Sequence, residues 1–172
     1  LKPFHSLIPT TAFKHIKPIF HPKALGLIIS GNTNLFIKTG NIKFLNENNK
    51  ILKLLIQIKN KEFSHLCWGH PFEWGDTPRY KMNDPLICVT APIGLWLLDW
   101  FEVSKEKELL EIIVDIKNHI IRENKWTTIK KNQEAVYYSN YNDIITFNGA
   151  SMVALFLTRL GEFNKKVQKK KR

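Results

Sequence analysis

A helical pattern recurs three times along this 172-residue chain, and it constrains the fold more than any other feature. Each copy opens with an apolar helix, near Ala24, near Ala91 and near Ala150. In the first two copies an amphipathic helix follows, over residues 42–61 and 109–124. Stacked α-hairpins have this signature, because an inner helix covered on both sides is apolar all round, whereas an outer helix is apolar on one face.

The recurrence predicts an all-α fold of the α/α toroid type, as a partial barrel of about three hairpins over residues 24–163. Gly40-Asn41 is expected to end the first helix, and Gly161 the last. Residues 1–23 carry four prolines and are expected to form an irregular lead-in, with a short helix around residues 11–17. Residues 164–172 are expected to be a solvated basic tail. The first residue is Leu1, so we expect a piece of a longer protein.

Charge and composition exclude several classes of function. The net charge is +11, but residues 165–172 hold six basic side chains and no acid, so the body is only mildly basic and no nucleic acid is expected as a partner. No window reaches the roughly 18 apolar residues of a membrane span, and residues 86–101 are expected to be a buried helix. Two cysteines form no disulfide framework, which favours a reducing, cytoplasmic setting. No glycine-rich phosphate loop is present, so no nucleotide cofactor is expected.

The connection over residues 64–89 is too long and too aromatic for a helix linker. Its aromatic rings can stack on the C–H face of a sugar, and its charged groups can form directional bonds to hydroxyls or to a uronate carboxylate. The expected substrate-binding residues here are Trp68, Trp74, Arg79 and Tyr80. Glu73 and Asp76 are the expected general acid and base, and His70 can share that role because an imidazole titrates near neutrality.

A second connection, over residues 125–148, mixes tyrosine with asparagine, which fits polyol recognition. The same residues also fit an ordinary β-turn or a short extended segment packed on the rim. The substrate-binding residues expected from it are Tyr138, Tyr141, Asp143 and Asn148. Asn148 has an alternative role as the N-cap of the third apolar helix.

Structural alternatives stand beside these roles. Trp68 and Phe72 can simply pin the loop onto the helices, and Glu73 can cap a helix or pair with Arg79. His65, Cys67 and His70 offer three possible zinc ligands, but no second close cluster accompanies them, so no metal is expected.

The octapeptide Cys67-Trp68-Gly69-His70-Pro71-Phe72-Glu73-Trp74 resembles the Cys-Trp-Gly-Tyr-Pro-Phe-Asp-Trp segment of an uncharacterised bacterial family associated with polysaccharide biosynthesis. The likeness extends to Val89–Gly94 and to Phe147–Ala150, each before an apolar helix. It departs at His70, where tyrosine is usual, and at Gly75, where glutamine is usual. The resemblance implies a six-hairpin α/α toroid related in shape to glycosidases, polysaccharide lyases and sugar epimerases.

Together, these features favour a carbohydrate-active protein that acts on a bacterial polysaccharide or its precursor, with hydrolase, lyase or epimerase chemistry and a saccharide as ligand. A non-catalytic α-hairpin scaffold that binds a glycan or a protein is the alternative, as is an inactive fragment of a larger toroid enzyme. The fold analogy by itself does not choose between them.

Overall fold

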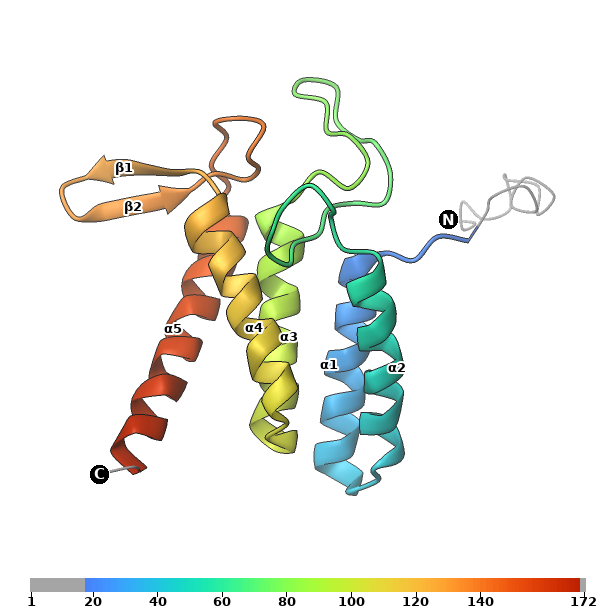
Figure 1. Ribbon diagram of the computed structural model, residues 1–172. Coiled ribbons are helices and arrows are strands. Elements are labelled where there is room, and N and C mark those ends of the chain that lie inside the picture. Colours follow the sequence, from blue (N-terminus) through green and yellow to red (C-terminus); the bar gives the residue numbers. More distant parts are fainter. Residues whose placement is uncertain (1–17, 171–172) are drawn as a thin grey trace, which may run out of the picture.

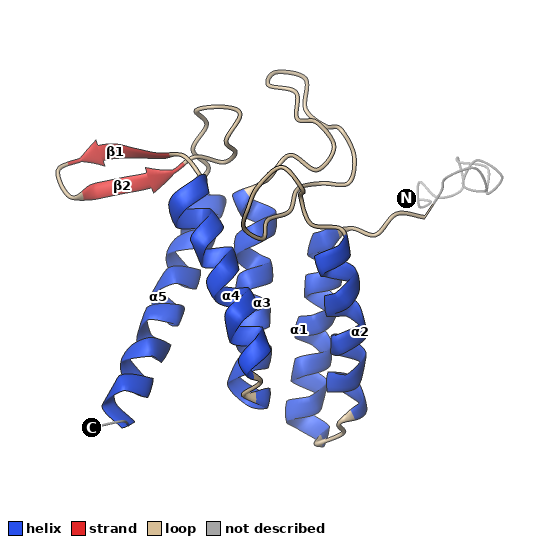
Figure 2. Ribbon diagram, viewed as in Figure 1, coloured by secondary structure: helices blue, strands red, loops and turns tan. Residues whose placement is uncertain are grey.

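The computed structural model describes residues 18–170, and this part of the chain is mostly helical (Figures 1 and 2). The elements in chain order are α1 (Pro22–Thr39), α2 (Lys43–Gln57), α3 (Ile87–Ser104), α4 (Lys107–Asn118), the π-helical turn η3 (His119–Glu123), β1 (Trp126–Lys130), β2 (Gln133–Val136) and α5 (Phe147–Lys170). The short helix expected around residues 11–17 lies outside the described residues.

The helices form two layers. In the inner layer α3 packs between α1 and α5, while α2 packs on α1 and α4 packs on α3. Figure 1 shows that α1, α3 and α5 all begin at the same end of the molecule, whereas α2 and α4 run in the opposite direction. The described chain is therefore two antiparallel hairpins followed by a fifth helix, with the long loops gathered at one end.

Local sequence explains where α1 begins and ends. Pro22 occupies the first helical position, where its missing N–H costs nothing, and the side chain of His21 caps the helix by accepting from the backbone N–H of Lys23 at 3.2 Å. Gly40 ends the helix with φ of 66° and donates its backbone N–H to Phe36 at 2.8 Å, as expected.

The core is centred on α3, whose residues are buried on nearly every side, including Leu97, Leu98 and Trp100. This confirms the buried helix expected over residues 86–101. Within the described residues only α3 has the length and apolar composition of a membrane span, and 67% of that window is buried inside the structure, as for the central helix of a packed layer. Gly94 lets α5 approach closely, since a Cβ there would lie 2.8 Å from the ring of Phe156.

Four details differ from the sequence-based expectations. A small antiparallel hairpin, β1–β2, projects from the helices, so the class is mostly helical rather than purely α. Its strands contain β-branched and aromatic residues, and Asn132 in the turn has φ of 63°. The outer helix α2 ends at Gln57 rather than near residue 61.

The other two differences concern the inner layer. The helix α5 continues through Gly161 to Lys170, because an isolated glycine weakens a helix without ending it. The helix α1 is not covered on both sides: Leu27 and Ile28 are 60% and 50% exposed, because α1 lies at one edge of the inner layer.

Candidate functional site

The first loop, residues 58–86, connects α2 to α3 and is anchored by buried polar contacts at its root (residues 60–70 and 81–86). Trp68 is 1% exposed, and its indole N–H donates to the carbonyl of Leu55 at 2.8 Å. The buried hydroxyl of Thr90 accepts from the backbone N–H of Trp68 at 3.0 Å. The side chain of Asn60 donates to the carbonyl of Asn83 at 2.8 Å, which joins the two arms of the loop. The root is thereby fixed to the helices.

Gly69 lies where the two arms cross. A Cβ at this position would stand 1.8 Å from the carbonyl oxygen of Asp84, a separation that no side chain tolerates. Close by, the backbone N–H of Asn83 donates to the carbonyl of His70 at 2.7 Å. The glycine of the Cys-Trp-Gly segment is therefore required by the approach of two backbones.

An outer clamp of two carboxylates and two imidazoles holds the other side of the root. Glu123 accepts from the backbone N–H groups of Ser64 and His65, at 3.0 and 3.2 Å, and contacts the buried ring of His119 at 3.0 Å. Asp115 contacts the ring of His65 at 2.7 Å and accepts from the N–H of Leu66 at 2.8 Å. Burial lowers the pKa of His119, against the opposing effect of Glu123.

At the far end of the loop, the tip (residues 71–80) encloses an open hollow lined by Glu73, Trp74, Gly75, Asp76 and Arg79. The backbones of Trp74 and Tyr80 exchange two hydrogen bonds, at 3.2 and 2.9 Å, which closes the tip into a small hairpin. Arg79 forms an ion pair with Glu73 across the hollow. Four of the site residues expected in this loop, Glu73, Trp74, Asp76 and Arg79, thus line one space.

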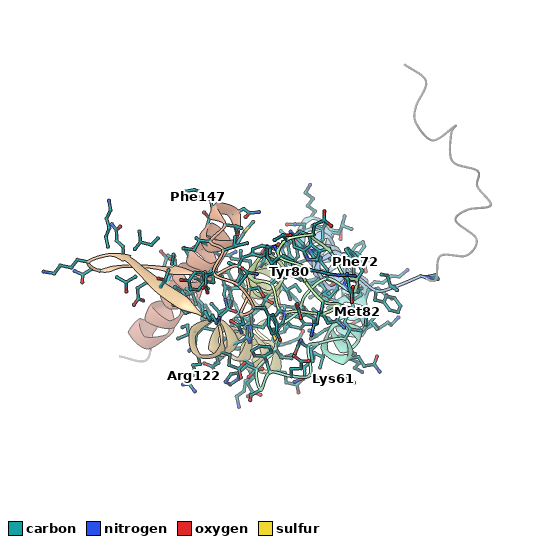
Figure 3. All side chains as sticks on the ribbon, turned by 90° about the horizontal axis from the view of Figure 1, so that it is seen from above. Lys61, Phe72, Tyr80, Met82, Arg122 and Phe147 are labelled. Carbon is teal, nitrogen blue, oxygen red and sulfur yellow. The ribbon has the colours of Figure 1, made fainter. Side chains whose placement is uncertain are left out.

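Aromatic rings connect this tip to the second loop (residues 137–146). Trp74 stacks on Tyr80 with ring centroids 4.8 Å apart. The ring of Tyr138 is nearly perpendicular to both, with its centroid 6.2 Å from that of Trp74 and 5.7 Å from that of Tyr80. The hydroxyl of Tyr80 accepts from the side-chain amide of Asn142 at 2.9 Å. Figure 3, seen from above, places Tyr80 near the middle of the loop layer, with Phe72 and Met82 on the side away from the β-hairpin.

A pair of histidines, the inner latch, ties the last residue of the root before the tip to the start of α1. Nε2 of His21 lies 3.0 Å from Nδ1 of His70. Because Nδ1 of His21 accepts from the N–H of Lys23, a neutral His21 carries its proton on Nε2 and donates to His70, which then carries its own proton on Nε2. Burial lowers the pKa of both imidazoles, and neighbouring Lys23 adds to the effect.

His21 was missed by sequence reasoning, which placed it in the irregular lead-in. Only its position before Pro22 hinted at a capping role, and nothing in the sequence signalled a partner 49 residues away. His70 is held in the latch and faces the edge of Trp74 at 5.4 Å. In the neutral latch it offers an N–H donor rather than the free lone pair of a general base.

Three of the predicted sugar-stacking rings are buried, which corrects that part of the expectation. Trp68, Tyr80 and Tyr138 are 1%, 5% and 8% exposed, because the loops pack these rings onto the helices and onto one another. For Trp68 the alternative role of pinning the loop is the observed one. Trp74 is partly exposed and lines the hollow, whereas Tyr141 is 52% exposed but lies elsewhere. The indole N–H of Trp74 is itself buried and has no hydrogen-bond partner in the described part of the chain.

The remaining predicted residues of the second loop do not line the hollow. Tyr141 donates its hydroxyl to Glu62 at 3.0 Å, and Asp143 lies 3.9 Å from Lys125. Asn148 is exposed in the first turn of α5 and accepts from the N–H of Gly149, so it is not the N-cap. The structure therefore brings Glu73, Trp74, Asp76 and Arg79 together, and leaves these three elsewhere on the loop layer.

The three possible zinc ligands in the first loop have different surroundings. His65 contacts Asp115, His70 contacts His21, and Cys67 is buried with its pKa raised by burial. Among residues 18–170 no group of three or more His, Cys, Asp or Glu side chains is placed to hold a metal ion.

Neither a family model nor a curated protein sequence matches this chain.

Proposed function

We propose that the tip hollow binds a saccharide, and that the protein is carbohydrate-active, with a polysaccharide or its precursor as ligand. One observation carries the proposal: a partly open indole, two carboxylates and a guanidinium converge on a hollow built upon a rigid root. An indole face covers the C–H face of a pyranose, while carboxylates and guanidinium groups bond its hydroxyls with directional geometry.

The helical layers are proposed to be a segment of an α/α toroid. The alternation of inner and outer helices, the common direction of α1, α3 and α5, and the gathering of long loops at one end support this assignment. In such an arrangement a ligand site at the loop end is built by loops on a rigid helical frame, which is where the tip hollow lies.

Catalysis of hydrolase, lyase or epimerase type is proposed with Glu73 and Asp76 as the acid and base. One observation favours the non-catalytic alternative, a glycan-binding module. Glu73 is half exposed and engaged by Arg79, an arrangement suited to recognition of polar groups in open solvent. The two free cysteines support a cytoplasmic setting for either function.

The test is a titration of the purified chain with neutral, amino and uronic saccharides, followed by tryptophan fluorescence. A saturable change is expected that Trp74→Phe abolishes and the matched control Trp126→Phe preserves, because Trp126 lies at the base of the β-hairpin. If a ligand is found, Glu73→Gln and Asp76→Asn distinguish an enzyme, which loses turnover, from a module, which has none. A flat response across the panel from folded protein would remove the proposal.

A further inference from the structure

The exposed side of α1 carries a continuous stripe of small and aliphatic residues. They recur at intervals of four, three and four positions, so they share one face of the helix, and all are exposed. The α1 stripe consists of Ala24, Ile28, Gly31 and Leu35, with Lys38 at its lower end. Among the described residues nothing lies within 4 Å of the position that a Cβ on Gly31 would occupy. In this part of the chain the face of α1 is therefore apolar and uncovered.

The helix α5 carries a comparable exposed stripe, with residues three or four positions apart and one adjacent pair. The α5 stripe consists of Phe147, Ser151, Ala154, Leu155 and Thr158, with Glu162 at its lower end, and all six are exposed. Phe147 is 95% exposed and Leu155 is 49% exposed. Figure 3 places Phe147 at the margin of the molecule when it is seen from above.

The two stripes face away from α3, which lies between their helices. On α1, Gly26 contacts α3 and is two residues from Ala24, so the stripe points about 200° away from that contact. On α5, Phe156 contacts α3 and is likewise two residues from Ala154. The stripes therefore occupy the two opposite edges of the inner layer.

The stripes are complementary when the helices are laid side by side in the same direction. Each large residue then meets a small one, and the lower ends bring opposite charges together. The pairs, which lie at nearly equal distances from the two helix starts, are Phe147 with Ala24, Ser151 with Ile28, Leu155 with Gly31, Thr158 with Leu35, and Glu162 with Lys38. Such alternation of large and small residues is what close helix packing requires.

The contacts already present within the inner layer also place a glycine of one helix against a large side chain of the next. A Cβ on Gly26 of α1 would lie 2.6 Å from the ring of Trp96 on α3. A Cβ on Gly149 of α5 would lie 2.7 Å from the side chain of Ile87 on α3. On the exposed edge of α1, Gly31 is a small residue of the same kind. Leu155 lies at nearly the same distance along α5 and is the large side chain that would pack against it.

We propose that a second copy of this chain covers these edges: the α5 stripe of each copy packs against the α1 stripe of the other. Because one molecule offers both stripes at opposite edges, two copies make two identical contacts and close a ring of six inner helices. The helices meet in parallel, so the loops of both copies gather on one face. This inference does not depend on the proposed saccharide function.

The mass of the 172-residue chain in solution, measured by sedimentation, is the first test. A dimer is expected, and Leu35→Glu in the α1 stripe is expected to give monomers with an unchanged circular dichroism spectrum, because Leu35 is 43% exposed in a single copy. The control Ile129→Glu, at a residue 57% exposed on the β-hairpin, should leave the dimer intact. A monomeric wild type, or an open series of larger assemblies, would overturn the proposal.

Cross-linking tests which edges meet. Chains carrying Gly31→Cys are mixed with chains carrying Leu155→Cys and oxidised, and a covalent dimer is expected from the mixture but from neither variant alone. Ile129→Cys replaces one partner as the control and should give no covalent dimer. A cross-link between two Gly31→Cys chains would mean that α1 meets α1, and no cross-link in the mixture would mean that these edges do not meet; either result contradicts the proposal.

Discussion

The root and the tip of the first loop are held by different kinds of interaction. The root is joined to the helices through the buried hydrogen bond of Trp68 and through the carboxylates of Asp115 and Glu123, while Asn60 joins its two arms. The tip is held by stacked rings and by the hydrogen bond between Tyr80 and Asn142, with the latch of His21 and His70 beside it. Its hollow is lined by exposed charged residues, whereas the root is largely buried.

This difference separates positioning from recognition. Buried, fully partnered polar groups give a root with one well-defined conformation, since each broken bond would leave a desolvated donor or acceptor. The tip has fewer such constraints and can adjust its exposed side chains to a ligand. Adaptable contacts on a rigid base are the usual arrangement of a binding loop.

The largest expected effect comes from adding one methyl group to the root. Gly69→Ala puts a Cβ 1.8 Å from the Asp84 carbonyl, so the two arms must separate and the backbone bonds around them are lost. The free energy of unfolding should fall by about 3 kcal/mol or more. The control Gly161→Ala, in a helix with no neighbour within 4 Å, should raise it by up to about 1 kcal/mol. Urea denaturation measures both, and equal effects would contradict a strained crossing.

Removing the outer clamp should have the next largest effect. Glu123→Ala leaves the amides of Ser64 and His65 and the ring of His119 without their acceptor, and we expect a loss of about 3 kcal/mol in the free energy of unfolding. Hydrogen exchange should report faster opening of residues 63–66. Glu111→Ala is the matched control, because its pair with Lys107 is exposed and worth under about 0.5 kcal/mol.

Mild acid should act on the inner latch. Because the pKa values of His21 and His70 are lowered in the folded chain, the unfolded chain binds more protons below about pH 6.5, and stability falls as the pH decreases from there. Each histidine contributes at most about 1.4 kcal/mol per pH unit. The buried His119 acts with the same sign, so the variant His21→Asn, which keeps a capping oxygen, should reduce the slope without abolishing it.

Two measurements distinguish the latch from the clamp in that experiment. Denaturation between pH 8 and pH 5 excludes Glu123, because hydrogen bonds from His119 and two amides lower its pKa despite its burial and its contribution is lost only below about pH 4.5. His119 of the clamp still contributes over this interval, so the difference in slope between wild type and His21→Asn is the part that belongs to the latch. Fluorescence of Trp74 should change over the same interval in the wild type, and in His21→Asn the change should be smaller. An identical pH slope in both proteins would exclude a role for the latch.

The smallest effect on stability is expected at the tip. Glu73→Gln breaks an exposed ion pair with Arg79, and the free energy of unfolding should change by under about 0.5 kcal/mol. Saccharide affinity, where a ligand is found, should nevertheless fall, because an acceptor in the hollow is lost. Glu47→Gln, which breaks an exposed pair with Lys50 on α2, is the control for both measurements. A large loss of stability in Glu73→Gln alone would place Glu73 with the root.

Periodicity located the helices well because it reports local structure. The apolar helix at residues 86–101, the turn at Gly40 and the amphipathic outer helices follow from spacing and caps. The β-hairpin after residue 125 was not predicted, because a short strand pair lacks a strong local signal and here depends on anchoring by Trp126, whose indole N–H donates to Ile120.

The tip hollow was partly predictable. Glu73, Trp74, Asp76 and Arg79 are neighbours in sequence, so their meeting in one loop follows from proximity along the chain. The partnership of His21 with His70, and the burial of Trp68, involve contacts 49 and 13 residues apart that no local rule specifies.

By itself the sequence determined the helical rhythm, the end of α1 at Gly40 and the chemical content of the first loop, because each depends on residues within a few positions of one another. Only the tertiary structure decided which rings are buried, which carboxylates hold the root and which face of α1 is left open. Those outcomes depend on the path of the chain between helices, and loop conformation is set by the packing of distant residues rather than by spacing.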